Sequence, residues 1–336
     1  MIFFDARWNG DTGIGRFCRE VRFRIHSFTD LPLDGNPAGP FDPLRLAAFL
    51  VRKPNCAFFS PGYNSPIFGA GKFILTVHDL NHVDVEDNSG FLKRLYYRFV
   101  LKRACKRASR IFTVSEFSRQ RIISWAKVSG ESVVCVGNGV SDVFLQGQRN
   151  DTSRDPSDGY LFCVGNRKGH KNEVAAVRAL GDLRSYPNIR LVFSGSPSGE
   201  LLDEAERVGV SSRVSFAGRL SEDELRAHYQ SAAALVFLSH YEGFGLPLVE
   251  AMAVGCPVIA SSTTALGEIA GNAAVLVDPK DRAAILVALN SVLESTELRR
   301  ELAVMGKCRA AEFSWERVAE RVEREVRLAG LVLSTS

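Results

Sequence analysis

Short apolar runs alternate with longer segments of mixed polarity along the whole chain of 336 residues. The runs have the length and composition of buried strands. In the first half, the predicted strands are Ile2–Phe4, Phe73–Val77, Ile111–Val114 and Val133–Val136. In the second half, they are Tyr160–Val164, Arg190–Phe193, Val214–Phe216, Ala233–Leu238, Pro257–Ala260 and Ala274–Val277.

Segments of helical character separate these strands. We expect a loop at Gly13-Ile14-Gly15 and then a helix over Arg16–Ile25. Another helix begins after Ser115, which is a good N-cap residue. A long terminal helix is predicted over Trp315–Leu328. Strands that alternate with helices in this way predict a parallel sheet in each half of the chain.

The length of the chain predicts two domains. A chain of 336 residues is too long for a comfortable single core, so we expect an α/β protein with two Rossmann-like domains. The polar segment 150–159 contains Pro and Gly and lacks periodicity, which makes it the best linker. We therefore place the domains at residues 1–150 and 151–336. The two domains are expected to face each other across a central cleft, with the carboxyl ends of their strands around it. Ligands bind at these ends in open α/β sheets.

Composition and cysteine usage are those of a globular cytoplasmic protein. Hydrophobic residues make up 46% of the chain, and its mean hydropathy is −0.02. No apolar run approaches the roughly 18–20 residues that span a bilayer. The start, Met1–Asp5, has no charged region of the kind that opens a signal peptide. The seven cysteines are scattered without a CxxC pair, which favours reduced thiols in the cytoplasm.

Positive charge is concentrated in the first half. Residues 1–150 hold 21 Lys and Arg against 13 Asp and Glu, a balance of +8, whereas residues 151–336 have a balance of −4. Segment 91–110 is the richest, and its apolar residues Leu92, Leu95, Phe99 and Val100 recur at helical spacing. The cations in this segment are Lys93, Arg94, Arg98, Lys102, Arg103, Lys106, Arg107 and Arg110.

This pattern predicts a basic amphipathic helix, and two interpretations of it are open. The helix covers the core with a solvated face, or it contacts an anionic membrane surface. We do not expect nucleic-acid binding, because the aromatic residues of the segment have the positions of core residues rather than of a stacking platform.

The segment Glu242-Gly-Phe-Gly-Leu-Pro-Leu-Val-Glu250 is the most informative in the chain. It follows an apolar run and precedes small residues, which predicts a strand, a glycine loop and a helix. Pro247 fits an early helical position. Gly243 and Gly245 let the backbone approach a ligand, and the free N–H groups at the helix start favour an anion. Two carboxylates for hydroxyls and a helix N-terminus for phosphate suit a sugar nucleotide.

Two further segments carry candidate chemistry. Val164-Gly165 ends a strand and Lys171 opens the next helix, where a cation is what a leaving diphosphate needs. No metal-binding Asp-x-Asp precedes an acidic cluster, so we expect no metal ion and assign its task to positive side chains. His78 ends another strand in a His-Asp pair, where a structural histidine is the alternative to a functional one.

In combination, these segments resemble the retaining glycosyltransferases of the two-domain GT-B fold, specifically family 4, which includes many bacterial mannosyltransferases. The resemblance extends over nearly the whole chain. It rests on Gly13-Ile-Gly-Arg-Phe17, Thr76-Val-His-Asp-Leu80, Thr113-Val-Ser-Glu-Phe-Ser118, Asn138-Gly-Val140, Val164-Gly-Asn-Arg-Lys-Gly-His-Lys-Asn172, Ser239-His-Tyr-Glu-Gly-Phe-Gly-Leu-Pro-Leu-Val-Glu250 and Phe313-Ser-Trp315.

The resemblance implies catalytic roles for four residues. Glu242 is expected to contact the donor sugar hydroxyls and to stabilise positive charge at the anomeric carbon. Lys171 is expected to bind the donor diphosphate, and His78 the donor sugar or the developing oxyanion. Many relatives have an arginine directly after the glycine, where this chain has Asn166. Arg167 is therefore our choice for the fourth residue, and its rivals are Lys168 and His170.

The resemblance also implies a set of donor-binding positions. Glu250 is expected to accept hydrogen bonds from the nucleotide ribose. Arg219 and Leu220 fall where relatives hold the base through backbone groups. The other expected positions are Gly13, Gly15, Gly165, Gly243, Phe244, Gly245 and Leu246.

The implied activity is that of a metal-independent hexosyltransferase with no cofactor beyond its nucleotide diphosphate sugar donor. We expect transfer of mannose from GDP-mannose, with retention, to a glycan or polyprenyl-linked acceptor in bacterial surface polysaccharide or lipopolysaccharide biosynthesis. GDP-rhamnose, GDP-fucose and UDP-sugars are alternatives, as is a non-transferring sugar-nucleotide binder or an epimerase. Where relatives have Asn and Leu-Pro-Glu, this chain has Ser262 and Leu266-Gly-Glu268, which bears on donor choice.

The family also suggests where the protein acts and how its chain ends. The enzyme is expected in the cytoplasm, with a peripheral contact to the inner face of the cytoplasmic membrane through helix 91–110. The last helix, about residues 315–330, is expected to pack back onto the N-terminal domain.

Overall fold

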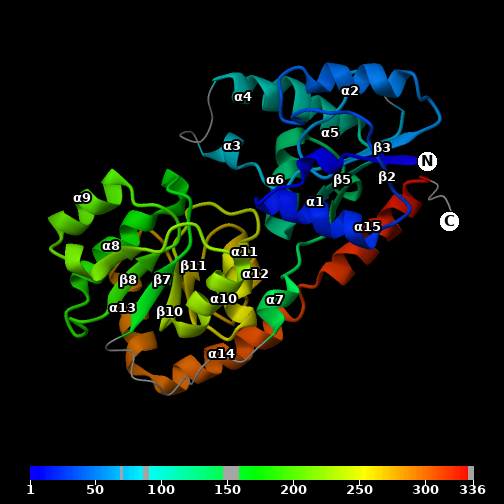
Figure 1. The fold of residues 1–336 in the computed structure, drawn as a ribbon. Helices are drawn as coiled ribbons and strands as arrows, with labels where there is room; N and C mark the ends of the chain where they lie inside the picture. Colours follow the sequence, from blue (N-terminus) through cyan, green and yellow to red (C-terminus); the bar gives the residue numbers. More distant parts are fainter. Residues whose placement is uncertain (69–70, 86–90, 147–158, 332–336) are drawn as a thin grey trace. The chain divides into compact units, whose positions relative to one another are not determined.

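The computed structural model describes residues 1–68, 71–85, 91–146 and 159–331 (Figure 1). The chain divides into two compact units, Met1–Gly139 with Ser314–Ser336, and Val140–Phe313. The division therefore comes earlier than the expected 150/151 boundary. Residues 150–158 of the expected linker lie outside the described residues. Within the described part of the chain, no helix is both long enough and apolar enough to cross a bilayer.

The first unit contains a parallel sheet of six strands in the order β2-β1-β3-β4-β5-β6. Its strands are β1 (Ile2–Phe4), β2 (Thr29–Asp30), β3 (Ala57–Ser60), β4 (Phe73–Thr76), β5 (Arg110–Thr113) and β6 (Val133–Cys135). Sequence analysis missed β2 and β3. β2 is two exposed residues at the sheet edge, whereas β3 is a buried run of four residues, three of them apolar.

Helices and turns connect the strands of the first unit. The helices are α1 (Gly13–Arg24), α2 (Asp42–Val51), α3 (Asn81–Asp84), α4 (Phe91–Leu95), α5 (Lys102–Arg107), α6 (Glu116–Ala126) and α15 (Trp315–Leu328). The prediction of a glycine loop at 13–15 was wrong, because α1 begins at Gly13. Thr12 caps it by accepting a hydrogen bond from the N–H of Gly15 at 3.1 Å. Gly15 lies so close to Gly10 that an added Cβ would meet the Gly10 carbonyl oxygen at 2.2 Å.

The terminal helix α15 has the bounds predicted from the sequence and belongs to the first unit. It lies beside α1 in Figure 1. Trp315 is 2% exposed, and its ring centroid lies 6.3 Å from that of Phe17 in α1. A Cβ on Gly139 would lie 2.6 Å from Trp315, so the backbone there must be glycine to admit the indole. The first unit's core is thus completed by the last helix.

The predicted basic helix over 91–110 is α4, a π-helical segment at Tyr96–Leu101, and α5. Its predicted apolar face is wrong. Leu95 and Phe99 are 40% and 57% exposed, whereas the buried residues are Tyr97, Leu101, Ala104 and Cys105. The physical reason is that the wider π turn changes which positions lie on one face, so a 3.6-residue period assigns the wrong side chains to the core.

The second unit has a second parallel sheet, in the order β12-β11-β10-β7-β8-β9. Its strands are β7 (Tyr160–Cys163), β8 (Arg190–Phe193), β9 (Val214–Phe216), β10 (Ala234–Phe237), β11 (Val258–Ser261) and β12 (Val275–Val277). Its helices are α7 (Asp142–Leu145), α8 (Glu173–Asp182), α9 (Gly199–Arg207), α10 (Glu222–Ser231), α11 (Leu246–Ala253), α12 (Ala265–Ala270), α13 (Arg282–Glu294) and α14 (Thr296–Ala310).

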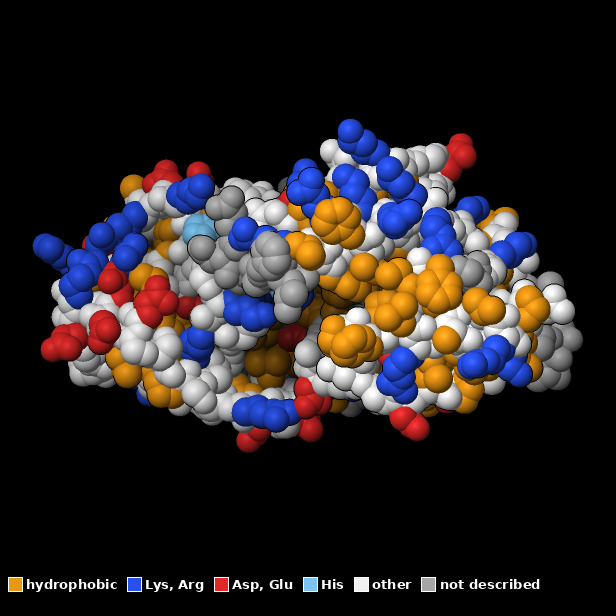
Figure 2. Space-filling view, turned by 90° about the horizontal axis from the view of Figure 1, so that it is seen from above, with side chains coloured by type: hydrophobic (Ala, Val, Ile, Leu, Met, Phe, Trp, Pro, Cys, Tyr) orange, Lys and Arg blue, Asp and Glu red, His pale blue; other side chains and the backbone are white. Residues whose placement is uncertain are grey.

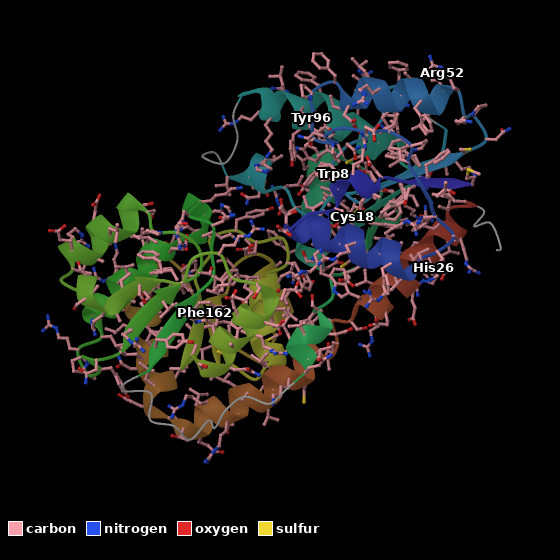
Figure 3. All side chains as sticks on the ribbon, viewed as in Figure 1. Trp8, Cys18, His26, Arg52, Tyr96 and Phe162 are labelled. Atoms are coloured by element: carbon pink, nitrogen blue, oxygen red, sulfur yellow. The ribbon has the colours of Figure 1, made fainter. Side chains whose placement is uncertain are left out.

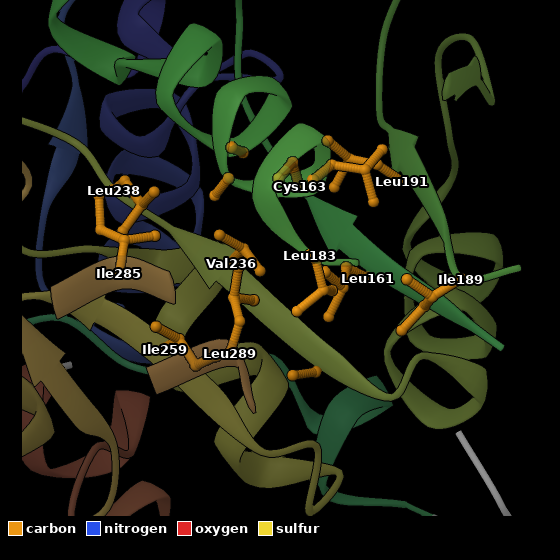
Figure 4. Close-up of a cluster of buried hydrophobic side chains, with 14 of the residues drawn as sticks. Leu161, Cys163, Leu183, Ile189, Leu191, Val236, Leu238, Ile259, Ile285 and Leu289 are labelled. Atoms are coloured by element: carbon orange, nitrogen blue, oxygen red, sulfur yellow. The ribbon is translucent and has the colours of Figure 1, made fainter. Parts of the chain in front are cut away.

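All six predicted strands of the second half are present, with small shifts at their ends. One core lies between the sheet and helices α8, α9 and α13, where Leu161, Val236 and Ile259 pack with Ile285 and Leu289 (Figure 4). On β7, Phe162 points to a different cluster and its ring stacks on His228 of α10 with centroids 4.9 Å apart (Figure 3). Both faces of the sheet are therefore covered by helices, which explains the nearly continuous apolar strands.

Candidate functional site

The strand order of the second sheet identifies where a ligand binds. The chain runs from β7 outwards to β8 and β9, and then returns to place β10 on the other side of β7. In open α/β sheets, ligands bind at the carboxyl ends of the strands where the order reverses in this way. The two loops at this point follow β7 and β10, and they carry Lys171 and Glu242.

The structure brings these two predicted residues into direct contact. Lys171 Nζ donates to Glu242 Oε1 at 2.6 Å, and their side chains are 15% and 13% exposed. The ammonium also lies 5.6 Å from the ring centroid of Phe237 at the end of β10. The backbone N–H of Glu242 donates to Thr264 Oγ1 at 3.2 Å, which connects its loop to the start of α12. A cation and a carboxylate thus lie together at the switch point.

Asn172 holds the loop that carries Lys171. It has the left-handed backbone conformation, with φ of 52°, between a 3-10 turn at Gly169–Lys171 and α8. Its side-chain amide donates to the carbonyl oxygens of Leu238 at 3.1 Å and Pro279 at 3.0 Å. Asparagine tolerates this conformation better than most residues. Asn172 therefore joins the loops after β7, β10 and β12.

Arg167 makes different contacts from those expected of a diphosphate-binding arginine. Its guanidinium forms an ion pair with Glu173 and donates to the carbonyl oxygens of Ser194 and Ser196. It also lies 5.4 Å from the ring centroids of both Phe193 and Phe216. Its hydrogen-bond donors are therefore largely occupied by Glu173, Ser194 and Ser196.

The two rivals of Arg167 differ in exposure. His170 is 7% exposed, and its carbonyl oxygen accepts from the N–H of His240 at 2.7 Å. Lys168 has an exposed side chain for which the described residues provide no ion-pair or hydrogen-bond partner. Of the three candidates, Lys168 is the one whose cation is not already engaged.

Glu173 was missed by sequence analysis and explains Gly165. A Cβ on Gly165 would lie 2.5 Å from Glu173 Oε1, so the glycine makes room for this carboxylate. Burial raises the pKa of Glu173, while the charge and hydrogen bonds of Arg167 act in the opposite direction. A signal was present in the sequence, since an acidic residue in the first turn of a helix is favoured by the helix dipole.

The helix after Glu242 is built as the sequence predicted. Gly245 is the N-cap of α11 with φ of 99°, and Pro247 is in the first turn. An added Cβ on Gly245 would lie 2.4 Å from Leu266 Cδ2. Glu250 is 3% exposed and accepts a hydrogen bond from Tyr229 Oη of α10 at 3.1 Å. This hydrogen bond holds its carboxylate between α11 and α10.

The remaining predicted donor positions are dispersed. Phe244 is 4% exposed and packs edge-to-face on Phe313, so its side chain belongs to the core. Gly243 is buried, whereas Leu246 is partly exposed at the start of α11. Arg219 and Leu220 follow β9, which β8 separates from β7. Arg219 and Leu220 therefore follow a strand that is two positions away from β7 in the sheet.

The first sheet has its own switch point, with β2 on one side of β1 and β3 on the other. Arg7, after β1, is paired with two buried carboxylates, Asp5 at 2.7 Å and Asp42 at 2.7 Å. Asn64, after β3, donates to Asp5 Oδ2 at 2.6 Å and accepts from Trp8 Nε1 at 2.8 Å. No local pattern predicts this network, because its members come from three distant segments.

The network anchors the loop that holds His78. His78 follows β4 and is 6% exposed, and its Nε2 lies 2.8 Å from the carbonyl oxygen of Pro61, in the loop after β3. A carbonyl oxygen only accepts, so Nε2 carries the proton and the neutral ring offers Nδ1 as an acceptor. Burial lowers the pKa of His78, which favours this neutral form. Gly13 and Gly15 lie in the same unit, at the start of α1.

The described residues contain no group of three or more His, Cys, Asp or Glu side chains placed to hold a metal ion. The second switch point carries Lys171 and Glu242, and the first carries Arg7 with Asp5 and Asp42, while His78 follows β4. Such groups can bind hydroxyls and compensate charge on a phosphate.

Comparison with known proteins adds two family matches. Residues 12–143 match the model described as Glycosyltransferase Family 4, and residues 146–307 match the one described as Glycosyl transferases group 1. Among similar proteins, O-antigen chain mannosyltransferase B of Escherichia coli is 27% identical over 261 residues. O-antigen chain mannosyltransferase RfbU of Salmonella typhimurium is 29% identical over 220 residues. MMP alpha-(1->4)-mannosyltransferase of Mycolicibacterium hassiacum is 34% identical over 234 residues.

These three matches cover 72, 65 and 68% of this chain, and 67, 60 and 56% of the relatives' own lengths. Among solved structures, HepE from Anabaena in complex with UDP has a TM-score of 0.77 at 17% identity, over 97% of this chain and 99% of that one. WaaG, a glycosyltransferase involved in lipopolysaccharide biosynthesis, has a TM-score of 0.73 at 16% identity, with 97% and 99% covered. At these identities, the structural likeness concerns the fold.

Proposed function

Because this chain belongs to the group 1 and family 4 glycosyltransferases, we propose that it transfers a hexose, with retention, from a nucleoside diphosphate sugar to an acceptor hydroxyl. The observation that carries the proposal is the contact between Lys171 and Glu242 at the switch point of the second sheet. A lysine suits the diphosphate and a carboxylate suits the hydroxyls and the cationic anomeric carbon. Glu250 is our candidate for the ribose hydroxyls.

The proposed reaction needs no enzymic nucleophile. The bond between the anomeric carbon and the phosphate oxygen breaks, and the acceptor oxygen bonds to the same face of the sugar. The acceptor proton passes to the departing phosphate oxygen. Lys171 stabilises the negative charge on the leaving diphosphate, while Glu242 stabilises the positive charge on the sugar. Positive side chains take the part that a metal ion has in other transferases.

We assign the second diphosphate cation to Lys168 in place of Arg167. Arg167 is held by Glu173, two carbonyl oxygens and two aromatic rings, so freeing it would leave a buried carboxylate without its partner. Lys168 precedes the same 3-10 turn as Lys171 and has an exposed side chain. Moving Lys168 to a phosphate would therefore break no contact between described residues.

For His78, we propose a role as hydrogen-bond acceptor for a sugar hydroxyl. The proton on Nε2 is committed to Pro61, which leaves Nδ1 as the group that can meet a ligand. An unprotonated nitrogen cannot donate to an oxyanion, so the alternative role that family resemblance suggested is disfavoured.

The proposed donor is GDP-mannose and the transferred sugar is mannose, because the three relatives named above are mannosyltransferases. Uridine nucleotides are the second candidate, since HepE, which shares this fold, was solved with UDP. The proposed acceptor is a glycan or polyprenyl-linked intermediate of surface polysaccharide synthesis. We further propose that the protein contacts an anionic membrane peripherally through segment 91–110, which carries the exposed apolar residues Leu95 and Phe99.

Thermal unfolding with GDP, UDP, ADP and their sugars tests the proposal. A ligand at 100 times its Kd adds about 2.7 kcal/mol of stability to the folded state. We expect the nucleotides of one base to raise the unfolding temperature more than the others do. NMR of the product should show the same anomeric configuration as the donor. Absence of binding by every nucleoside diphosphate and its sugars would refute the proposed function.

A further inference from the structure

We propose that the first unit contains a separate anion site, a pocket beside α4 and α5 that binds the phosphate or diphosphate of an amphiphile. The biological role of this site rests on the proposed function, because the site would recognise an acceptor that is a phosphate ester on an apolar chain. Both the lipid of a bilayer and a lipid-linked acceptor carry this chemistry. The pocket belongs to the first unit, whereas Lys171 and Glu242 belong to the second.

The pocket has a volume of about 360 Å³. Cations at Arg94, Arg98 and Lys102 line it, at spacings of four residues along one helical segment. Tyr97 and Trp125 contribute aromatic surface, and none of the described residues that line the pocket is acidic. This volume is within the range of small-molecule sites. A concave site whose described charged residues are all cations attracts anions more strongly than a flat surface does.

Two of the cations have no counter-ion among the residues that the structure describes. Arg98 and Lys102 form neither an ion pair nor a hydrogen bond through their side chains within the described part of the chain. Lys102 Nζ lies over the ring of Trp125 at 5.7 Å, and the Arg98 guanidinium over Phe99 at 5.6 Å. The nearby carboxylate of Asp84 is already paired with Arg121. A phosphate is the ligand that such cations favour, since arginine binds its oxygens through two parallel N–H bonds.

The backbone beside the pocket is π-helical. Residues Tyr96–Leu101 form a π-helical segment between α4 and α5, and the N–H of Lys102 donates to the carbonyl oxygen of Tyr97. Tyr97 and Leu101 are 3% and 0% exposed, while Arg98 stays exposed between them. Such segments are rare and are frequent at functional sites. The π turn thus keeps the helix packed while Arg98 and Lys102 line the pocket.

Apolar side chains beside the pocket indicate that the ligand is an amphiphile. Leu95 and Phe99 are 40% and 57% exposed and alternate with Arg94 and Arg98. Figure 2 shows cationic and apolar side chains side by side on the face of the first unit seen there. Inorganic phosphate would leave Leu95 and Phe99 in water, whereas the chain of an amphiphile would cover them.

Calorimetry with farnesyl diphosphate and with pyrophosphate tests the pocket. We expect farnesyl diphosphate to bind more tightly than pyrophosphate. The variant R98A/K102A should weaken its binding on the order of tenfold or more. The matched control is R103A/K106A, which removes the same charge from exposed positions of α5 that do not line the pocket. The control should stay close to the unaltered protein.

Sedimentation with phosphatidylglycerol vesicles distinguishes the two sources of the phosphate. Selective loss of vesicle binding in R98A/K102A, with no farnesyl diphosphate binding in the unaltered protein, assigns the pocket to a bilayer headgroup. Selective loss of farnesyl diphosphate binding assigns it to a lipid-linked acceptor. Equal weakening in both double variants, or in neither, overturns the pocket in favour of general surface charge.

Two controls keep the result interpretable. The single variant R98E changes an exposed residue, so it should fold normally and still abolish binding. Binding of GDP and UDP is measured on the same samples, and it should be unchanged in every pocket variant. Loss of nucleotide binding in the unaltered protein counts against the proposed function, whereas normal nucleotide binding without a selective effect of R98A/K102A counts against the pocket alone.

Discussion

Lys171 Nζ and Glu242 Oε1 lie 2.6 Å apart and join the loop after β7 to the loop after β10. The two residues are 71 positions apart in the chain, and they meet because β10 returns to the side of β7. In this state each neutralises the other. If these residues bind the donor as proposed, we expect the ion pair to exchange partners, so that the lysine turns to the diphosphate and the carboxylate to the sugar.

This exchange predicts that Glu242→Gln binds a nucleoside diphosphate more tightly than the unaltered protein. The substitution removes the competing anion from Lys171 and a negative charge near the diphosphate. We expect a gain of about 1 kcal/mol, or roughly fivefold in Kd, by calorimetry with GDP and UDP. The gain should vanish in the Lys171→Met/Glu242→Gln double variant. Unchanged or weaker binding by Glu242→Gln would contradict the exchange.

Turnover should respond in the opposite direction. Lys171→Ala and Glu242→Ala are each expected to lower kcat by about 10²–10³, the usual effect of losing one group that stabilises charge in a transition state. The measurement is initial rate at saturating donor, with unfolding curves to confirm the fold. Near-normal kcat in a Glu242→Ala protein that binds donor would refute the catalytic role of this residue.

Arg167 and Lys168 should separate into a structural and a functional cation. Arg167→Ala leaves the buried Glu173 without its ion-pair partner and should lower the free energy of unfolding by ~3 kcal/mol. Adding Glu173→Gln should recover part of that loss. Lys168→Ala should leave urea unfolding unchanged while raising the KM for the donor. The assignment fails if Lys168→Ala binds donor normally and the Arg167→Ala/Glu173→Gln protein does not.

His78 predicts a pH dependence of stability. Its pKa is lowered in the folded protein, so below about pH 6.5 the unfolded chain binds more protons and folding stability falls with decreasing pH. The slope from one such group is at most about 1.4 kcal/mol per pH unit. His78→Gln, whose amide can still donate to Pro61, should have a shallower slope between pH 5 and pH 7. Equal slopes in both proteins would show that His78 is not buried in its neutral form.

Two glycines offer a test of the local geometry. Gly245→Ala must adopt φ near 99° and place a methyl group 2.4 Å from Leu266, so we expect a loss of roughly 2–4 kcal/mol in the free energy of unfolding. Gly199→Ala is the matched control, because nothing lies within 4 Å of its added Cβ and it begins α9. That control should be neutral or slightly stabilising. Similar losses in both variants would contradict the geometry at α11.

Local sequence predicted much of the second unit because its strands are apolar runs flanked by clear turn and cap residues. β8 and β9 and the terminal helix α15 have the predicted bounds. Prediction was weaker in the first unit. There β2 and β3 were not predicted, α1 begins within the glycines of the expected loop, and the π turn changes which face of the basic segment is buried.

The sequence by itself determined the fold class and singled out Lys171, Glu242 and His78 as candidates, since apolar periodicity and motif order are local properties of the chain. Only the tertiary structure decided which of these groups have partners. Strand order places Lys171 on Glu242, close packing turns Arg167 towards Glu173, and a carbonyl from another strand's loop fixes the proton of His78. The reason is physical: ion pairs and hydrogen bonds depend on distances between segments that no local pattern records.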